Sequence, residues 1–319
     1  MSRMILDNKR HFLFILIIIF GLAACAQSNE SRRSSGTGRP PTMRGAASSK
    51  DVIATTTIFA ALVQTVAHGK FRVRALVPAG VSPETYEPKP RDLVSLEHAA
   101  LLVENGAGLE AWLQKILSSA GSPNLQVLVL SDGLTPSVRA TSNLYANPHY
   151  WLDPVFAQTY VEEISAALSR LDPANATEYR SNAGKEIRRL QALDAWIRRQ
   201  VATIPPQNRA MITYHDAWYY FDRRYGIRDL GSIVSSPGKD PSAAEFAALI
   251  AKARANHVRA VFAEPEFSPK LINQLARSAH IRTVTDLYDD SLGQTPQLST
   301  YEGVMRYDVT AIVDALKNG

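Results

Sequence analysis

Short apolar runs alternate with helix-like patterns along most of the chain, from residue 51 to the end. The apolar runs predict strands at 52–58, 71–77, 100–103, 126–130, 210–214, 260–263 and 282–285. Segments with helical spacing lie between them, at 59–68, 92–98, 109–119, 217–225, 242–256, 269–280 and 301–316. Strands that alternate with helices of about ten residues indicate βαβ units and parallel sheets. We therefore expect an α/β protein.

One long helix interrupts this alternation. Asp172 is a candidate N-cap, Pro173 suits the first helical position, and no further proline occurs before Pro205. Apolar residues within this stretch recur at helical spacing, at positions 187, 190, 193, 197 and 201. A helix of about 30 residues is about 45 Å long, which exceeds the width of one small lobe.

These patterns together predict two α/β lobes, each built on a parallel sheet and bridged by one long rigid helix. We place the N-terminal lobe at 51–171, the linking helix at 172–204 and the C-terminal lobe at 205–319. Ligands of parallel α/β sheets bind beyond the carboxyl ends of the strands. We therefore expect a ligand site in the cleft between the lobes.

The first fifty residues have a different character. A run of thirteen apolar residues at 12–24 follows a basic start, and it is too short for a membrane span of about 20 residues. This layout predicts a signal peptide at 1–24. Small residues before Cys25, the only cysteine of the chain, resemble a bacterial lipobox; an ordinary signal peptide with an incidental cysteine is the alternative. We expect a lipid on Cys25, a flexible polar tether at 25–50, and a location on the outer face of the membrane, periplasmic or extracytoplasmic.

The basic charge of the chain belongs to this leader and tether. The net charge is +5, but the first 50 residues hold eight basic and two acidic residues, so residues 51–319 carry a net charge of −1. A nearly neutral body removes the main argument for nucleic-acid binding. A single cysteine excludes an internal disulfide scaffold, and 45% apolar residues are enough for real cores.

Four side chains follow predicted strands at positions that could meet in the cleft. His215 directly follows strand 210–214, Asp286 follows strand 282–285, and Glu84 follows a short turn after a strand. His149 lies in a proline-flanked loop of the first lobe. Two imidazoles and two carboxylates could hold a divalent first-row metal ion, since imidazole suits zinc and carboxylate oxygen suits manganese. Four protein ligands leave no open position for a reacting water, which favours binding over catalysis.

Four segments carry a resemblance to one family, in the order that the family has them: 78–88 (PAGVSPETYEP), 147–154 (NPHYWLDP), 214–217 (YHDA) and 263–269 (AEPEFSP). They resemble the cluster A-I substrate-binding proteins of ABC transporters, which include zinc- and manganese-uptake lipoproteins and members once called adhesins. The resemblance covers essentially all of 51–319. It implies two α/β lobes bridged by a rigid helix, in agreement with the pattern above.

The resemblance also implies that the family's four ligand positions are Glu84, His149, His215 and Asp286. The first position is usually histidine, and relatives specialised for manganese place their glutamate at the third position, where this chain has His215. The histidine-rich loop of many zinc-uptake members would lie between 132 and 147 and is absent here. We expect Zn²⁺ first and Mn²⁺ close behind as cargo, because zinc binds most nitrogen and oxygen sites more tightly than manganese.

We therefore expect a monomeric, non-enzymatic binding protein that captures a metal ion and delivers it to an ABC permease. A secreted zinc metallohydrolase is one alternative, although its His-Glu-x-x-His signature is absent. An adhesin in which metal is a structural staple is another. Glu84 could instead be a solvated carboxylate or a partner of a ligating histidine, and Glu264 and Glu266 could line the cleft.

Overall fold

The computed structural model describes residues 51–120, 124–134 and 147–318. The predicted signal peptide, the lipidation of Cys25 and the tether lie outside these residues. Within the described ranges, none of the helices combines the length and the apolar character that crossing a bilayer requires. The described residues belong to one compact unit.

Two four-stranded parallel sheets form the frame; the sequence predicts the parallel sheets but only three of the four strands of the second. The first has the order β2-β1-β3-β4 and the second β6-β5-β7-β8. The first sheet consists of β1 (Asp51–Ala54), β2 (Arg72–Ala75), β3 (Leu101–Glu104) and β4 (Gln126–Val129). The second consists of β5 (Ala210–His215), β6 (Arg228–Val234), β7 (Ala260–Phe262) and β8 (Arg282–Val284). In the first sheet Val52 lies opposite both Val73 and Leu101, and all four residues of β1 are buried.

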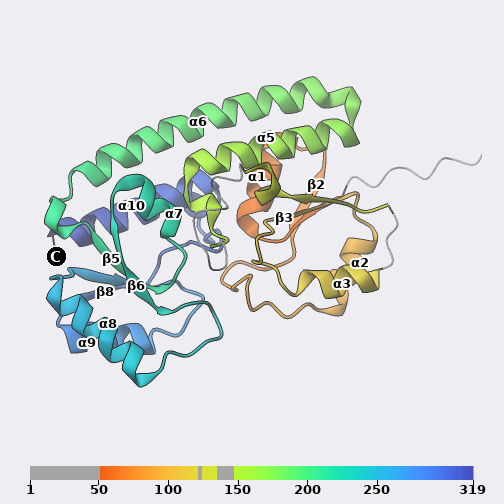
Figure 1. Ribbon diagram of the computed structural model, residues 1–319. Coiled ribbons are helices and arrows are strands. Elements are labelled where there is room, and N and C mark those ends of the chain that lie inside the picture. Colours follow the sequence, from red (N-terminus) through yellow and green to blue (C-terminus); the bar gives the residue numbers. More distant parts are fainter. Residues whose placement is uncertain (1–50, 121–123, 135–146, 319) are drawn as a thin grey trace, which may run out of the picture. The chain divides into compact units, whose positions relative to one another are not determined.

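Helices connect and cover the strands. In the first half of the chain these are α1 (Thr57–Ala67), α2 (Pro90–Glu97), α3 (Leu113–Ala120) and α5 (Pro154–Leu171). In the second half they are α7 (Tyr219–Tyr225), α8 (Ala243–Ala255), α9 (Lys270–Ala279) and α10 (Tyr301–Asn318). The long helix α6 (Ala176–Ala202) runs above both sheets (Figure 1). At 27 residues it is about 40 Å long, which confirms the predicted linking helix.

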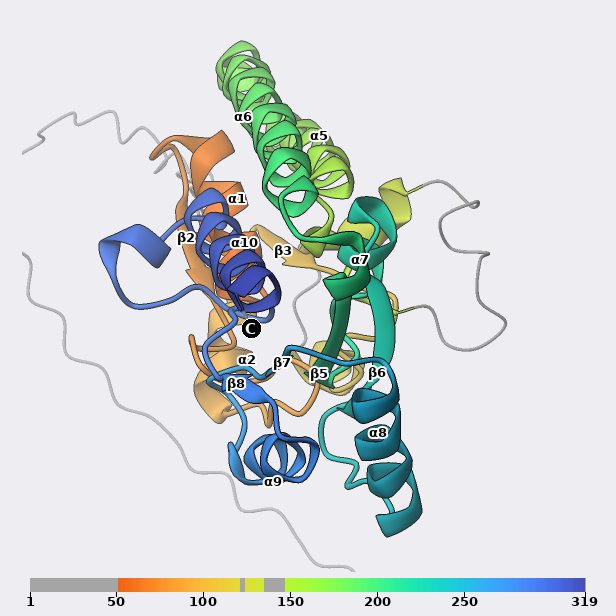
Figure 2. The same cartoon turned by 90° about the vertical axis from the view of Figure 1, so that its left-hand side faces the viewer.

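One apolar core extends across both halves. Helix α6 packs against α5, α1 and α10 (Figure 2), and its buried positions repeat every three or four residues. These positions are Tyr179, Ala183, Glu186, Leu190, Leu193, Ile197 and Val201. The last helix, α10, reaches back to contact α1 of the first half. The same core cluster includes Trp151 from the first half and Trp218 from the second. The two halves are therefore held together by side-chain packing as well as by the covalent chain.

Two elements of the fold were missed by the sequence patterns. Helix α5 begins at Pro154, where the Asp153 side chain accepts a hydrogen bond from the Val155 amide at 2.9 Å. An aspartate followed by proline is a helix-start signal that was available in the sequence. Strand β6 is harder to detect, because Gly231 has a φ of 114° and the pairing register with β5 shifts between Met211 and Thr213.

Candidate metal centre

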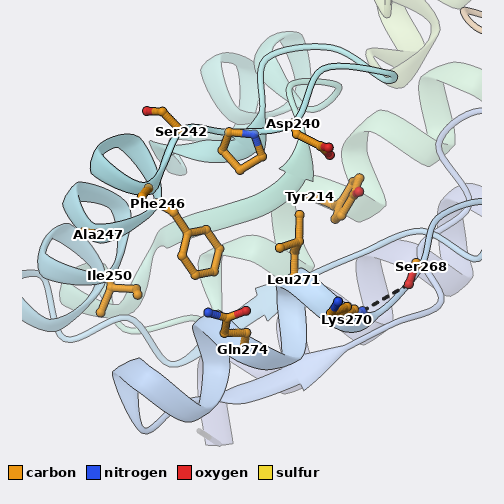
Figure 3. A pocket seen from close by; sticks show the side chains of 12 residues that line it. Tyr214, Asp240, Ser242, Phe246, Ala247, Ile250, Ser268, Lys270, Leu271 and Gln274 are labelled. Carbon is orange, nitrogen blue, oxygen red and sulfur yellow. Dashed lines mark hydrogen bonds between the residues drawn. The ribbon is translucent and has the colours of Figure 1, made fainter.

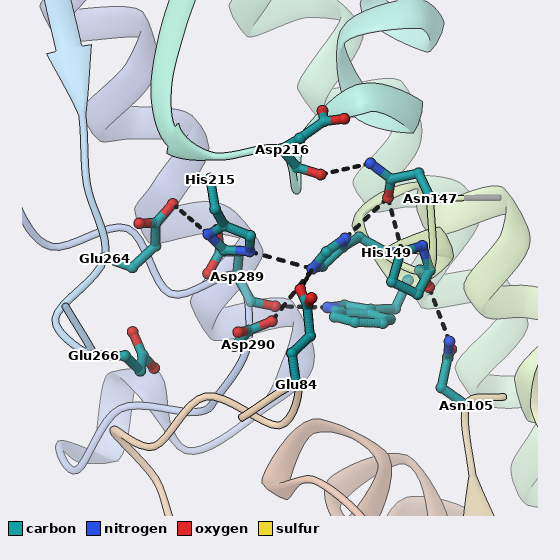
Figure 4. A network of polar contacts seen from close by, with 12 residues as sticks. Glu84, Asn105, Asn147, His149, His215, Asp216, Glu264, Glu266, Asp289 and Asp290 are labelled. Atoms are coloured by element: carbon teal, nitrogen blue, oxygen red, sulfur yellow. Dashed lines mark hydrogen bonds and ion pairs between the residues drawn. The ribbon is translucent and has the colours of Figure 1, made fainter. Parts of the chain in front are cut away.

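Three of the four predicted side chains come together. Glu84 lies in the loop between β2 and α2, His149 precedes a short 3₁₀ turn at Tyr150–Leu152, and His215 is the last residue of β5. The Nε2 atom of His149 lies 3.3 Å from Nε2 of His215 and 3.6 Å from Oε1 of Glu84 (Figure 4). Both histidines are 1% exposed. These ligating atoms are close enough for one ion to contact all three.

The structure places the fourth predicted residue, Asp286, outside this cluster. Its carboxylate accepts a hydrogen bond from the hydroxyl of Tyr307 on α10. The carboxylate next to the cluster is that of Asp290, with Oδ1 3.6 Å from Nε2 of His149. Asp290 is 1% exposed, and its two carboxylate oxygens have no hydrogen-bond partner among the described residues.

The order of the strands explains why Asp286 lies away from the two histidines. Asp286 directly follows β8, but β8 is an edge strand, and β7 separates it from β5. Neighbouring strands are about 4.8 Å apart, so a residue at the end of β8 lies about 10 Å from the end of β5. The loop after β8 turns back toward the two histidines, so that Asp290, four residues after Asp286, lies beside His149.

Asn147 sets the orientation of the His149 ring. The Asn147 Oδ1 atom accepts hydrogen bonds from the backbone amide of His149 at 3.0 Å and from its Nδ1 at 2.9 Å. The Asn147 Nδ2 atom donates to the backbone carbonyl of Asp216 at 2.5 Å. Because a backbone amide only donates and a carbonyl only accepts, the side-chain amide has one consistent orientation. His149 therefore carries its proton on Nδ1, and the lone pair of Nε2 faces the cluster.

His215 has a different neighbour at its Nδ1. The Oε1 atom of Glu264 lies 3.3 Å away, and Oδ2 of Asp289 lies 4.0 Å away. Glu264 is 2% exposed and Asp289 is fully buried. A carboxylate beside the outer nitrogen of a ligating histidine raises the basicity of the ring and fixes its orientation. Glu264 lies two residues after the end of β7, and the sequence predicts that it could line the cleft.

The facing Nε2 atoms require one extra positive charge. With a proton on Nδ1 of each ring, both Nε2 atoms present lone pairs, which repel at 3.3 Å. One further proton makes His215 an imidazolium that donates to His149. Burial disfavours that charge, but the carboxylates of Glu264, Asp290 and Glu84 outweigh it and raise the pKa of His215 to about 9. A metal ion placed between the rings would replace this proton.

The pKa values of the adjacent carboxyl groups of Asp289 and Asp290 are shifted in opposite directions. Burial and the nearby Glu264 carboxylate raise the pKa of Asp289 well above its usual range, and its Oδ2 accepts from Trp218 Nε1 at 3.2 Å. Burial also acts on Asp290, but the contact with His149 and the charge of His215 lower its pKa overall. Asp290 is therefore the ionised member of the pair, as a metal ligand must be.

The segment that carries Asp290 is fastened to the first half of the chain. Trp151 Nε1 donates to the carbonyl of Asp289 at 2.7 Å, and the Leu292 amide donates to Thr57 Oγ1 at 2.8 Å. The hydroxyl of Ser291 accepts from the Gly80 amide at 3.1 Å. Gly80 belongs to the loop that also bears Glu84, so Asp290 and Glu84 are held together by the same contacts.

The cluster opens onto a cavity of about 380 Å³, which Glu84 and His149 line together with Asn147, Asp216 and Lys239. A second hollow, of about 680 Å³, lies beside α8 and α9 (Figure 3). Among its described lining residues Asp240 is the only carboxylate, and no histidine or cysteine is present. Of these two cavities, the first is the one lined by side chains of the cluster.

The other histidines of the described residues lie at helix ends. His68 and His280 are the C-caps of α1 and α9 in left-handed backbone conformations, and His98 caps α2. His257 also has a positive φ, directly after the C-cap of α8. All four are exposed.

Asp290 and Asn147 were not predicted from the sequence to lie at the cluster. Each had a signal in the sequence: Asp290 is half of an Asp-Asp pair in the loop after the last strand, and Asn147 lies two residues before His149. Neither signal specifies by itself which side chain faces the cleft.

Comparisons with known proteins point in the same direction as this geometry. The family model described as "Zinc-uptake complex component A periplasmic" matches residues 52–315. The manganese-binding lipoprotein MntA of Halalkalibacterium halodurans is 26% identical over 97% of this chain and 99% of its own length. The iron-binding protein YfeA of Yersinia pestis is 30% identical over 82% of this chain and 84% of its own. The solved structure of the periplasmic zinc-binding protein TroA from Treponema pallidum matches with a TM-score of 0.79 and 26% identity, over 84% of this chain and 99% of that one.

Proposed function

Because the chain belongs to the family of the periplasmic component A of zinc-uptake complexes, we propose that it captures a divalent transition-metal ion for delivery to an ABC permease. One observation carries the proposal. Glu84, His149, His215 and Asp290 come from four distant segments, and their ligating atoms converge at a buried point beside a cavity. The family match gives no support to the metallohydrolase or adhesin alternatives.

The charge of the cluster supports a divalent ion. Two ionised carboxylates and two neutral imidazoles carry a net charge of −2, which a dication neutralises, and the buried carboxylate of Glu264 beside His215 further favours a positive ion. A buried charge is costly unless it is paired, so a monovalent ion would leave one negative charge uncompensated. Until the ion binds, the extra proton on His215 neutralises part of the negative charge of the carboxylates.

The ligand types support zinc first and manganese as a close second. Two imidazole nitrogens favour zinc, whereas two carboxylate oxygens are acceptable to both ions and suit manganese well. Relatives named for manganese, iron and zinc all match this chain, so the cargo has to be decided by measurement.

Capture and release follow from the number of ligands. Four side chains surround the ion when the two sheets hold their present positions, and a small displacement of one sheet removes ligands. Since α6 packs on helices from both halves, we expect small movements rather than wide opening. With four protein ligands no coordination position remains for a reacting water, so we propose no catalytic turnover.

We further propose that the protein acts as a monomer outside the cytoplasm, anchored to the membrane by a lipid on Cys25. The sequence supports this location through the apolar run and the small residues before Cys25. Substitution of Cys25 by Ser should release the protein from the membrane fraction while leaving metal affinity unchanged.

The test of the function is direct measurement of the metal. Elemental analysis of the full-length chain, purified without added metal, should find zinc or manganese at about one ion per chain. Competition titration with a chromophoric chelator then ranks the two ions. His215→Ala should abolish tight binding, whereas His68→Asn removes an exposed imidazole at a position suited to Asn and should change nothing. Absence of saturable binding of both ions by the unmodified chain would contradict the proposal.

A further inference from the structure

Asn147 occupies a special position between the two sheets. Its side-chain oxygen holds the ring and backbone of His149, and its side-chain nitrogen donates to the carbonyl of Asp216 (Figure 4). Asp216 is the residue directly after His215. One amide therefore touches the turns that present both histidines of the cluster, which come from opposite halves of the chain.

The backbone of Asn147 is held from the second half as well. The hydroxyl of Tyr220 on α7 donates to the Asn147 carbonyl at 2.9 Å. The Tyr220 ring stacks on that of Tyr150, with centroids 4.6 Å apart, and Tyr150 directly follows His149. Movement of α7 and the β5 turn away from the first half would thus break two hydrogen bonds to Asn147.

The two histidines differ in how their outer nitrogens are held. The outer nitrogen of His215 faces Glu264, which follows β7 in the same half of the chain, so this contact does not cross between the halves. The partner of His149 is Asn147, which is itself fixed by a contact from the opposite half. The contact that orients His149 at its outer nitrogen is consequently coupled to closure of the two halves, whereas the outer-nitrogen contact of His215 stays within one half.

We propose that Asn147 is a positioning residue and a latch: it fixes the Nδ1–H form of His149, and through Asp216 it couples the alignment of that ring to closure around the ion. The part of this inference that concerns metal affinity rests on the proposed function. When the latch opens, His149 loses the restraint that directs Nε2 at the ion, so release begins at this ligand.

Two substitutions separate the two roles. Asn147→Ala removes both contacts. Asn147→Asp keeps an acceptor oxygen for His149 but replaces the donor to Asp216 by a second acceptor, which cannot bond to a carbonyl. Asn182→Ala is the matched control, because the Asn182 side chain also donates to a backbone carbonyl, that of Val66 at 3.2 Å, between α6 and α1 and away from the cluster.

Affinity and dissociation rates for Zn²⁺ and Mn²⁺, measured in the full-length chain by chelator competition, give the first readout. We expect Asn147→Ala to weaken binding about 10- to 100-fold, as is typical for loss of a residue that orients a metal-ligating histidine. Asn147→Asp should retain more of the affinity and release the ion several-fold faster than the unmodified chain. Asn182→Ala should match the unmodified chain. Equal affinity and release rates in all four proteins would overturn the proposal.

The ring form of His149 gives a second readout that does not depend on metal. Long-range ¹⁵N spectra of the imidazoles distinguish Nδ1–H from Nε2–H, and the signals of His149 are identified by their loss in His149→Gln. A protonated His215 that donates to Nε2 of His149 would itself hold that ring in the Nδ1–H form, so all spectra are recorded in a His215→Ala background. In that background we expect Nδ1–H with Asn147 intact and with Asn147→Asp, and a mixture with Asn147→Ala. This pattern, together with an unmodified chain that binds no metal, would contradict the transport function while retaining the positioning role. An unchanged ring form in Asn147→Ala would overturn the positioning role.

Discussion

The Oδ1 atom of Asp290 lies 3.6 Å from Nε2 of His149, although the two residues belong to opposite halves of the chain. This contact brings a loop that follows the second sheet against a ligand of the first. The loop stays there because neighbouring residues bond to the first half, including Trp151 to the carbonyl of Asp289. Three candidate ligands, Glu84, His149 and Asp290, are thus held as one group, and His215 approaches it from β5.

The choice between the two aspartates can be tested by a matched pair of substitutions. Asp290→Asn removes a charged oxygen from the cluster and should weaken zinc and manganese binding on the order of 100-fold, equivalent to about 2.8 kcal/mol. Asp286→Asn changes a partly exposed carboxylate that bonds to Tyr307, and its dissociation constants should stay within a factor of two or so of the unmodified chain. Chelator competition measures both, and the reverse ranking would restore Asp286 as the ligand.

Metal affinity should depend on pH up to about pH 9, which is higher than expected for a histidine with an unperturbed pKa near 6.5. Folding raises the pKa of His215 from 6.5 to about 9, so below pH 9 an ion must displace a proton. We expect affinity to rise about tenfold per pH unit from 6.5 to 9 and then to level off. Calorimetry in buffers of different ionisation enthalpy should detect about one proton released per ion at pH 7.5. Affinity that is already constant above pH 7 would show that His215 binds no extra proton.

The same shift affects the stability of the protein in the presence of a strong chelator. A raised pKa in the folded state stabilises the fold fully below pH 6.5, and this contribution is lost as the pH rises through about 9. Chemical denaturation at several pH values should show a decline over this interval. In His215→Gln, which cannot bind the proton, this part of the decline should be absent.

Binding of the ion should stabilise the folded chain by mass action. At a free concentration of 100 times the dissociation constant, the gain is about 2.7 kcal/mol, which raises the melting temperature by several degrees. Zinc and manganese should each produce this shift in the unmodified chain, and His215→Ala should show neither. The same melting temperature with and without both ions would argue against binding to the folded state.

Replacement of Glu84 should change the preference between ions. Glu84→His exchanges a carboxylate oxygen for a third imidazole, which favours zinc over manganese because nitrogen ligands suit zinc better. It also leaves a positive charge on the loaded cluster, so we expect manganese affinity to fall more than zinc affinity. Competition titration of the two ions measures the ratio, and a ratio that moves toward manganese would contradict the assignment of Glu84 as a ligand.

The sequence by itself determined the class of fold and most of the cluster. Alternation of strands and helices predicts parallel sheets, and the carboxyl ends of parallel strands lie at one edge. His215 at the end of β5 and Glu84 in the loop after β2 follow from that rule. The long helix α6 could also be predicted, because its apolar spacing and the surrounding prolines are local features.

Only the tertiary structure decided which aspartate faces the histidines and what holds them in place. The position of β8 at the edge of its sheet is set by pairing between distant strands, and local sequence does not report it. The path of the following loop depends on contacts with Trp151 and Thr57, more than a hundred residues earlier in the chain. For the same reason the role of Asn147 could not be derived from its neighbours in sequence, since its partner Asp216 reaches it only in the folded protein.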